Sequence, residues 1–396
     1  MKRPRSKSSS RLTPEAERLV TLALGLASSG SHTEDHYWED QIGQSLSRLL
    51  EHSHDNTLNA ALDHLFQTNT GAYDVLMDLI EAHTEAASFE HDGQTWDVLM
   101  IAAPIVAWSK YAIPSGPVNN EPALALSAHL QAHVMAAGTR FAFAPFLFSI
   151  DQLPRQFSEV RKLTRQLGLA ALENVMPKLD LLHLPETANL LADSRFLLAA
   201  VAAPRGKPLF RWQEISGTGH ASRSHCLEQW IAQGRPNLAP LLTGCVFECL
   251  LPEAYFVSCR EADRHVRPYA VRAAVSYLEN ALHLPAGNLR AVIGAFGGDR
   301  VDEYRIGFGQ RDKDEVVYGV VWPLYGREDE NAAPGPLDDI RTQLKESGVT
   351  DVVELSSILP PEYCDDCGAP LFPDAEGEVQ HAEMPEEVEE NRAHFH

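Results

Sequence analysis

The chain has 396 residues, of which 44% are hydrophobic and 22% are charged. This composition supplies enough apolar sequence for a sizeable core and excludes disorder of the whole chain. The 33 basic and 55 acidic residues give a formal net charge of −22, which repels phosphate and anionic lipid and disfavours a broad nucleic-acid-binding role. No apolar run approaches the roughly 18 residues of a membrane-spanning helix. The longest, residues 98–108, includes Pro104 and is predicted to be a buried, kinked helix.

Residues 1–12 are predicted to form a disordered basic tail, because they carry five Lys or Arg and no acidic residue. Thr13 and Pro14 then have the typical order of a helix start, an N-cap followed by proline. A basic stretch followed by the apolar residues 19–27 also resembles a secretory signal peptide. Charged side chains within residues 15–18 separate the two parts, so we predict an amphipathic helix and a cytoplasmic protein.

Residues 13–136 are predicted to form a helical domain. Apolar residues recur there at spacings of three and four, as in Leu46, Leu49 and Leu50, which places them on one face of a helix. Turn-forming residues interrupt the pattern at short intervals. We therefore expect about six helices with short connections, packed as a bundle or a short helical solenoid.

From residue 137 onward, strand-like runs rich in Phe and Val alternate with helical patterns. The order strand–helix–strand–strand–helix–strand is predicted twice, at residues 137–252 and 253–358. We therefore predict an α+β fold with tandem ferredoxin-like (βαββαβ) units after the N-terminal all-helical domain. A single mixed sheet with helices on one face is the alternative.

Two predicted hairpins carry much of this repeat, because each has a basic turn that contains glycine. The expected hairpin strands are residues 195–203 with 209–215, and residues 289–296 with 303–308. The second unit is also expected to open with a strand at residues 254–259.

The sharpest motif is the pair Cys364 and Cys367, which is followed by Gly368 in an acidic C-terminal tail predicted at residues 359–396. Two residues between the thiols let both sulfurs reach one tetrahedral ion, and the glycine permits the tight turn of a zinc knuckle. A redox dithiol is the competing interpretation. The two aspartates between the cysteines are expected to raise the thiol pKa, which opposes redox chemistry but is compatible with zinc.

A structural zinc ion normally takes four protein ligands, and no second cysteine pair follows. His381 is the best third candidate. His394 and His396 are further candidates, and a ligand could also come from the body of the protein or from a second subunit. The predicted zinc ligands are therefore Cys364, Cys367 and His381, with the fourth left open. The alternative is a reduced, exposed cysteine pair in a flexible tail.

Charged residues also gather where each predicted α+β unit passes from its first strand to its first helix. Arg264 and Arg267 could hold a carboxylate or phosphate in a bidentate manner, and helix N-termini favour anions. These residues define a candidate site for a small anionic ligand. Its members are Asp151, Arg155, Asp263, Arg264 and Arg267. The alternative is that the aspartates cap helices and the arginines pair with neighbouring acids.

Four stretches of the chain are distinctive, at residues 18–30, 102–109, 149–155 and 364–386. Through them the chain resembles an uncharacterised proteobacterial family, the domain-of-unknown-function 2863 family. The resemblance extends over nearly the full length. It implies a bacterial cytosolic protein with no established activity, and no catalytic residues can be transferred from it.

These features favour a non-enzymatic protein, a ligand-binding or protein-interaction module with a zinc-stabilised C-terminal tail. No nucleophile–base arrangement is recognisable in the sequence. The first alternative is an enzyme whose active site lies between the two α+β units at Asp151, Arg155, Asp263 and Arg264. The second is an adaptor whose tail at residues 1–11 contacts nucleic acid. The ligand, the protein partner and the oligomeric state are left open.

Overall fold

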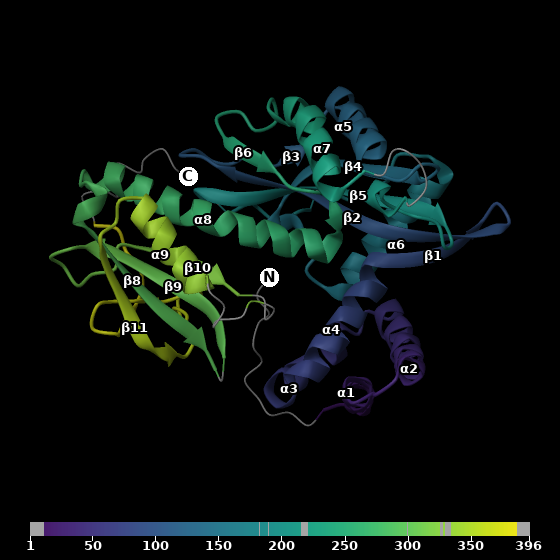
Figure 1. The fold of residues 1–396 in the computed structure, drawn as a ribbon, viewed down its shortest axis with the longest axis horizontal. Helices are drawn as coiled ribbons and strands as arrows, with labels where there is room; N and C mark the ends of the chain where they lie inside the picture. Colours follow the sequence, from purple (N-terminus) through teal and green to yellow (C-terminus); the bar gives the residue numbers. More distant parts are fainter. Residues whose placement is uncertain are drawn as a thin grey trace.

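The computed structural model has a mixed α+β fold, in which N-terminal helices and two larger β-sheets are connected through the long helix α8 (Figure 1). It describes residues 12–181, 183–188, 190–214, 221–298, 300–324, 328 and 334–385. The predicted basic tail therefore lies outside the described residues except for Leu12. Within the described ranges, no helix has both the length and the apolar content that crossing a membrane requires.

The N-terminal helices pack around one apolar core. They are α1 (Pro14–Ala27), α2 (His32–Glu51), α3 (Asp55–Thr68) and α4 (Thr70–Glu85). Thr13 caps α1, since its hydroxyl accepts a hydrogen bond of 3.2 Å from the backbone N–H of Ala16. Leu19, Leu46 and Leu62 are fully buried in the shared core. The three- and four-residue spacing of these leucines therefore matches the faces that the helices bury.

The first sheet begins where the sequence predicts more helix. Residues 86–108 form β1 (Ala86–His91) and β2 (Gln94–Trp108), so the prediction of a kinked helix at residues 98–108 is wrong. A strand buried on both faces has continuous apolar sequence, and periodicity alone cannot distinguish it from a buried helix.

The position of Pro104 explains how this proline fits inside a central strand. The neighbouring edge of β2 pairs with two short strands, β6 (Val246–Cys249) and β7 (Glu253–Ala254). Pro104 lies between the two pairings, where its carbonyl accepts a hydrogen bond of 2.9 Å from Leu250. Neither β6 nor β7 pairs with β2 at Pro104, so the missing N–H of proline removes no hydrogen bond between strands.

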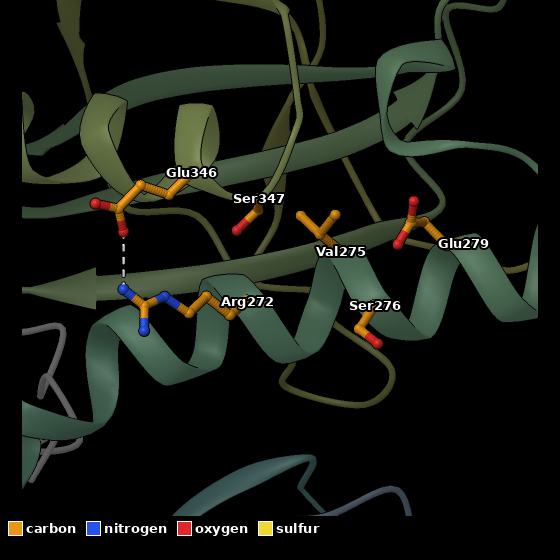
Figure 2. Close-up of a pocket in the computed structure, with 6 residues that line it drawn as sticks. All are labelled: Arg272, Val275, Ser276, Glu279, Glu346 and Ser347. Atoms are coloured by element: carbon orange, nitrogen blue, oxygen red, sulfur yellow. Dashed lines mark hydrogen bonds and ion pairs between the residues drawn. The ribbon is translucent and has the colours of Figure 1, made fainter.

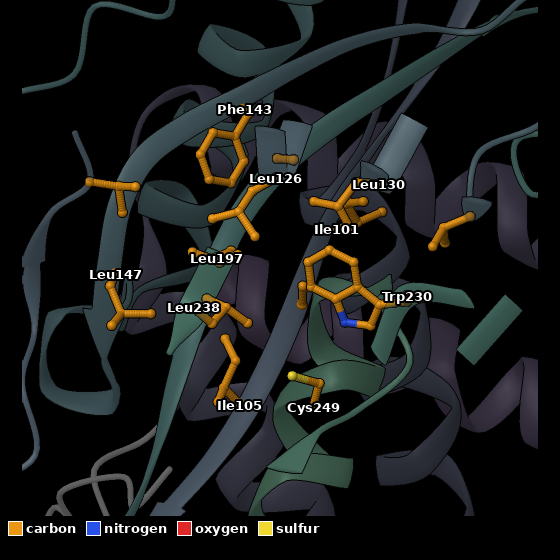
Figure 3. Close-up of a cluster of buried hydrophobic side chains, with 14 of the residues drawn as sticks. Ile101, Ile105, Leu126, Leu130, Phe143, Leu147, Leu197, Trp230, Leu238 and Cys249 are labelled. Atoms are coloured by element: carbon orange, nitrogen blue, oxygen red, sulfur yellow. The ribbon is translucent and has the colours of Figure 1, made fainter. Parts of the chain in front are cut away.

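The strand order of the first sheet is β1-β2-β5-β4-β3, with β6 and β7 also paired to β2. The strands not yet named are β3 (Gly116–Pro117), β4 (Arg140–Ser149) and β5 (Ala192–Pro204). Helices α5 (Asn120–His133) and α7 (Arg223–Leu238) cover one face of the sheet (Figure 1). There Ile101 and Ile105 pack with Leu126, Trp230 and Leu238 (Figure 3).

Helices α6 (Phe157–Glu173) and α8 (Tyr255–Leu282) cover the opposite face of the first sheet. Val160 of α6 and Ala262 of α8 pack there against Met100 and Ala102 of β2. The side chains of β2 thus alternate between two buried cores, which is the geometry of a strand covered on both faces.

The second sheet has the order β10-β9-β8-β11 and packs against the C-terminal half of α8. Its elements are β8 (Leu289–Gly297), β9 (Val301–Gln310), β10 (Tyr318–Pro323), α9 (Pro336–Glu346) and β11 (Asp351–Leu359). The hairpin predicted at residues 289–308 is confirmed. Strand β11 runs parallel to β8 after crossing over through α9.

The structure does not contain the predicted pair of βαββαβ units within its described residues. The strand predicted at residues 254–259 is wrong after Ala254, the last residue of β7, because α8 begins at Tyr255. The hairpin predicted at residues 195–203 and 209–215 is also wrong, because β5 pairs with β2 and β4. Both segments are short apolar runs whose partners are distant in sequence, so local pattern does not determine them. The alternative of a single sheet also fails, because the strands form separate sheets.

Carboxylates of the N-terminal helices cap two helices of the neighbouring region. The buried Asp55 accepts a hydrogen bond of 3.0 Å from the backbone N–H of Ser158, in the first turn of α6. Glu85 accepts a bond of 2.9 Å from the N–H of Phe256, in the first turn of α8. Burial is the main cause that raises the pKa of Glu85 to about 7. The nearby charge of Glu81 also raises it, whereas the Phe256 N–H and Arg260 lower it.

The raised pKa of Glu85 predicts a pH dependence of stability. Because this pKa of about 7 exceeds the ordinary 4.5, the folded chain binds the proton more tightly than the unfolded chain. Its stabilising contribution is therefore full below the ordinary pKa and is lost as pH rises towards 7. The difference between the two pKa values corresponds to about 3 kcal/mol of unfolding free energy. We expect Glu85→Gln to flatten the decline in unfolding free energy across this interval, measured by urea denaturation.

The exposed Glu17 in α1 provides the control, and Glu17→Gln should retain the pH profile of the unsubstituted chain. Identical profiles for Glu85→Gln and Glu17→Gln would show that Glu85 does not cause the pH dependence.

Candidate metal centre

The C-terminal segment at residues 360–385 folds into a tight turn followed by a small hairpin. In the turn, the N–H of Gly368 donates to the carbonyl of Cys364 at 2.9 Å, and the N–H of Cys364 donates to the carbonyl of Ala369 at 2.8 Å. Gly368 has φ +70°, a left-handed conformation that glycine adopts without steric cost. We call residues 364–368 the knuckle.

The hairpin is formed by β12 (Phe372–Pro373) and β13 (Val379–Gln380). The buried Asp374 organises its turn, because its Oδ1 accepts hydrogen bonds from the backbone N–H groups of Glu376 and Glu378 at 3.0 and 2.9 Å. His381 follows β13 directly. The hairpin thus returns the chain to the knuckle.

Three side chains converge at this point: Cys364, Cys367 and His381. Their ligand atoms all lie within 4.8 Å of one another, and Cys367 Sγ is 3.3 Å from His381 Nε2. Two sulfurs and one imidazole at this separation could hold a metal ion. Within the described residues, these three side chains form the group of His, Cys, Asp or Glu that lie close enough together to share one metal ion. The two further candidates, His394 and His396, lie outside the described residues.

The knuckle stabilises the thiolate of Cys364. The backbone N–H of Cys367, and next that of Asp366, donate towards this sulfur and lower the pKa of Cys364. The charge of Asp366 raises it, as the sequence predicts, but this effect is smaller. The expected increase in thiol pKa is therefore wrong for Cys364, because the turn directs N–H groups at the sulfur. The thiol pKa thus gives no argument against a redox dithiol at this residue.

A carboxylate lies beside the third donor. Glu383 Oε1 is 3.3 Å from His381 Nδ1, on the opposite side of the ring from the nitrogen that faces Cys367. Metal-bound histidines commonly donate this N–H to a carboxylate, which orients the ring and makes it a better donor. Glu383 lies near enough for that role, although its contact with Nδ1 is not aligned as a hydrogen bond.

The segment docks on a strip of glycines in the second sheet. A Cβ atom at Gly307 would lie 2.3 Å from the carbonyl oxygen of Pro373, and one at Gly319 would lie 2.3 Å from the ring of Phe372. Gly307 and Gly319 are direct register partners on β9 and β10. The sheet therefore lacks side chains where β12 crosses it, on the face opposite to α8 and α9.

Arg305 holds the segment from beneath. Its side chain is fully buried, and its Nη1 donates to the carbonyls of Glu362 and Leu371, both at 2.6 Å. Its Nε donates to Glu303 at 2.8 Å. The ring of Tyr363 lies 5.0 Å from the guanidinium. One cation thus connects the two chain segments that enter and leave the knuckle.

Sequence reasoning did not identify Arg305 or the glycine strip. Glycine inside a strand often marks a place where another chain segment approaches the backbone closely. Gly294, Gly307 and Gly319 could therefore have predicted that a segment packs on this sheet. Which segment approaches them depends on strand register, which the sequence does not display.

The comparison with protein families gives one match, to the model described as a protein of unknown function (DUF2863), over residues 4–395. The chain belongs to the DUF2863 family. No curated protein and no solved structure matches it. The chemistry of this DUF2863 chain must therefore be derived from its own residues.

The candidate anion site is divided between two elements. Asp151 lies in the 3-10 turn η1 (Ile150–Gln152), where it accepts a hydrogen bond of 2.9 Å from the N–H of Ala188. Arg155 donates to Asp151 at 3.3 Å and is otherwise largely exposed. These two predicted residues therefore pair with each other at the start of α6.

The other three predicted residues lie in the middle of α8, not at a helix start, because the expected strand before them is helical. Arg267 is buried and forms a bidentate pair with Glu328 at 2.9 and 3.1 Å. Arg264 lies 3.9 Å from the same carboxylate and also pairs with Glu261. Asp263 is half-buried. Burial of Cys259 is the main cause that raises the pKa of its thiol, and the charge of Asp263 raises it further.

Two cavities lie elsewhere on the described surface. One of about 480 Å³ is found between α8 and α9, where Arg272 and Glu346 form an ion pair of 2.9 Å across one end (Figure 2). Ser276, Glu279 and Ser347 line the rest of it. The other, of about 670 Å³, lies between α2 and α4. Neither cavity includes a residue of the metal centre or of the predicted anion site.

The glycine strip predicts a position that does not tolerate a side chain. Gly307→Ala would place a methyl group against the Pro373 carbonyl, and we expect a loss of about 1–3 kcal/mol in unfolding free energy. Gly287→Ala is the matched control, because no atom lies within 4 Å of its Cβ position. Thermal denaturation of both variants measures the effect. Equal melting temperatures would contradict the docking of β12 at this position.

Proposed function

We propose that the protein binds one zinc ion through Cys364, Cys367 and His381, and that the ion has a structural role. The observation that carries the proposal is the convergence of these three donors within 4.8 Å. They come from the two ends of one small unit, the knuckle and the residue after β13. An ion bound here would close that unit.

The donor set favours zinc over other common ions. Two thiolates exclude the oxygen-preferring Mg²⁺ and Ca²⁺ as suitable occupants, and a mixture of sulfur and imidazole is typical of zinc. The N–H groups that lower the pKa of Cys364 support this assignment, because a metal binds the thiolate and not the thiol.

The surroundings of the centre support a structural role. The knuckle and hairpin lie against the glycine strip, and Arg305 holds the two carbonyls that flank the knuckle. Further along, Met384 is buried in the core beneath the second sheet. The segment is therefore anchored on both sides of the three proposed ligands, and a zinc ion would hold together the part between these anchors.

The wider role that we propose is a cytoplasmic ligand-binding or protein-interaction module. All six cysteines are free, which is compatible with a reducing compartment. The alternative of an enzyme that uses Asp151, Arg155, Asp263 and Arg264 gains no support from the geometry. Arg155 pairs with Asp151 near the start of α6, whereas Arg264 pairs with Glu261 inside α8. The alternative role of the basic tail concerns residues outside the described ranges and stays a prediction.

The zinc proposal predicts one zinc ion per chain in protein purified without chelator, measured by elemental analysis. Cys364→Ser and Cys367→Ser should each weaken binding by roughly 100-fold or more, because a binding free energy of about 10–16 kcal/mol is shared among few ligands. Removing zinc should also lower the melting temperature of the unsubstituted chain.

Cys245→Ser is the matched control, because this half-buried cysteine lies outside the metal centre and should leave the zinc content unchanged. A chain without zinc, or with zinc that survives both Cys364→Ser and Cys367→Ser, would overturn the proposal.

A further inference from the structure

The proposed zinc site has three donors in the described part of the chain, whereas a structural zinc ion takes four ligands. We propose that the fourth position takes a neutral imidazole and discriminates against anionic ligands. This inference rests on the proposed function and adds the chemical class of the remaining ligand.

The position is accessible to an incoming side chain. Cys367 is exposed and Cys364 is half-buried, while the His381 side chain retains 37% of its accessible surface. The covered side of the unit is the one that faces the glycine strip and Arg305. An ion held by the three donors would therefore have its remaining position towards solvent.

Charge selects the ligand at this position. A zinc ion with two thiolates and one neutral imidazole has no net charge, so it does not attract anions by itself. Residues 360–385 contain seven acidic residues and no Lys or Arg. Asp365 and Asp366 lie between the two cysteines, and Glu383 lies 3.3 Å from His381 Nδ1.

This acidic surrounding raises the energy of a bound phosphate, carboxylate or thiolate through repulsion between like charges. A neutral imidazole avoids that cost and is a preferred zinc donor. The loop that contacts the hairpin does not reverse the balance. It carries the cations Arg311 and Lys313 beside Asp312, Asp314 and Glu315, and Arg311 is paired with Asp351 at 3.4 Å.

The imidazole has two possible sources with the same chemistry. One is the chain itself, through His394 or His396, which lie outside the described residues. The other is a histidine of a second molecule. A full-length variant without the two terminal histidines separates the sources, because it removes these ligands from every copy of the chain and leaves a histidine of a different protein unaffected.

The experiment uses full-length protein loaded with Co²⁺, whose visible spectrum reports its coordination. The unsubstituted chain, His394→Ala/His396→Ala and the control His129→Ala/His133→Ala are each titrated with imidazole, acetate and phosphate. The control removes a different pair of histidines, on α5. The near-ultraviolet thiolate–cobalt band must persist throughout, which shows that the metal stays in the site.

We expect imidazole to give a saturable spectral change in His394→Ala/His396→Ala, with no change from acetate or phosphate at the same concentrations. If the unsubstituted chain and the control resist imidazole, the source is the chain's own histidine. If they respond as the double variant does, the chain's own histidines do not fill the position, which leaves it open to a histidine of a different protein.

A double variant that ignores imidazole, or that responds equally to acetate, would overturn the inference. The absence of any thiolate–cobalt band in the unsubstituted chain would instead overturn the zinc proposal itself, so the two failures are distinguishable.

Discussion

The C-terminal region depends on one buried cation. Arg305 is fully buried, and a guanidinium in such a place is costly unless most of its N–H groups find acceptors. Its Nε and Nη1 find acceptors, whereas Nη2 has none among the described residues. Glu303 supplies one acceptor from the same strand, but two others are the backbone carbonyls of Glu362 and Leu371. The second sheet therefore satisfies its own buried charge only when the C-terminal segment is docked. Folding of the sheet and placement of the metal donors are coupled through this side chain.

The same coupling relates the small unit to the rest of the molecule. Helix α8 contributes its N-terminal half to the core of the first sheet and its C-terminal half to the core of the second. The second sheet has helices on one face and the knuckle with its hairpin on the other. A metal ion at the surface would thus stabilise the outermost of three layers. Glu85 connects the other end of α8 to the N-terminal helices.

The parts of the fold that sequence could predict are those determined by local signals. The hairpin of β8 and β9 has a glycine-containing turn between two apolar strands, and α9 begins at Pro336. Strand β2 and the start of α8 were mistaken for the opposite element, because both are apolar segments whose structure depends on distant partners. Because α8 begins earlier than predicted, three residues of the predicted anion site lie in a helix interior and not at a helix start.

The candidate metal centre shows the same division. Cys364 and Cys367 were predictable because their spacing suits one ion, and His381 was predictable as the nearest suitable donor. Their approach to within 4.8 Å shows that the hairpin between them has the right length. The platform beneath was not predictable, since Gly307 and Gly319 become neighbours only through the register of β9 with β10.

If zinc has the proposed structural role, metal binding and docking of the C-terminal segment are one event. Hydrogen exchange of the full chain, measured by mass spectrometry with and without zinc, tests it most directly. The account predicts that zinc slows exchange both in peptides from residues 360–385 and in peptides from β9 around Arg305, while the N-terminal helices are unchanged. Protection confined to the knuckle, with β9 unaffected, would contradict it.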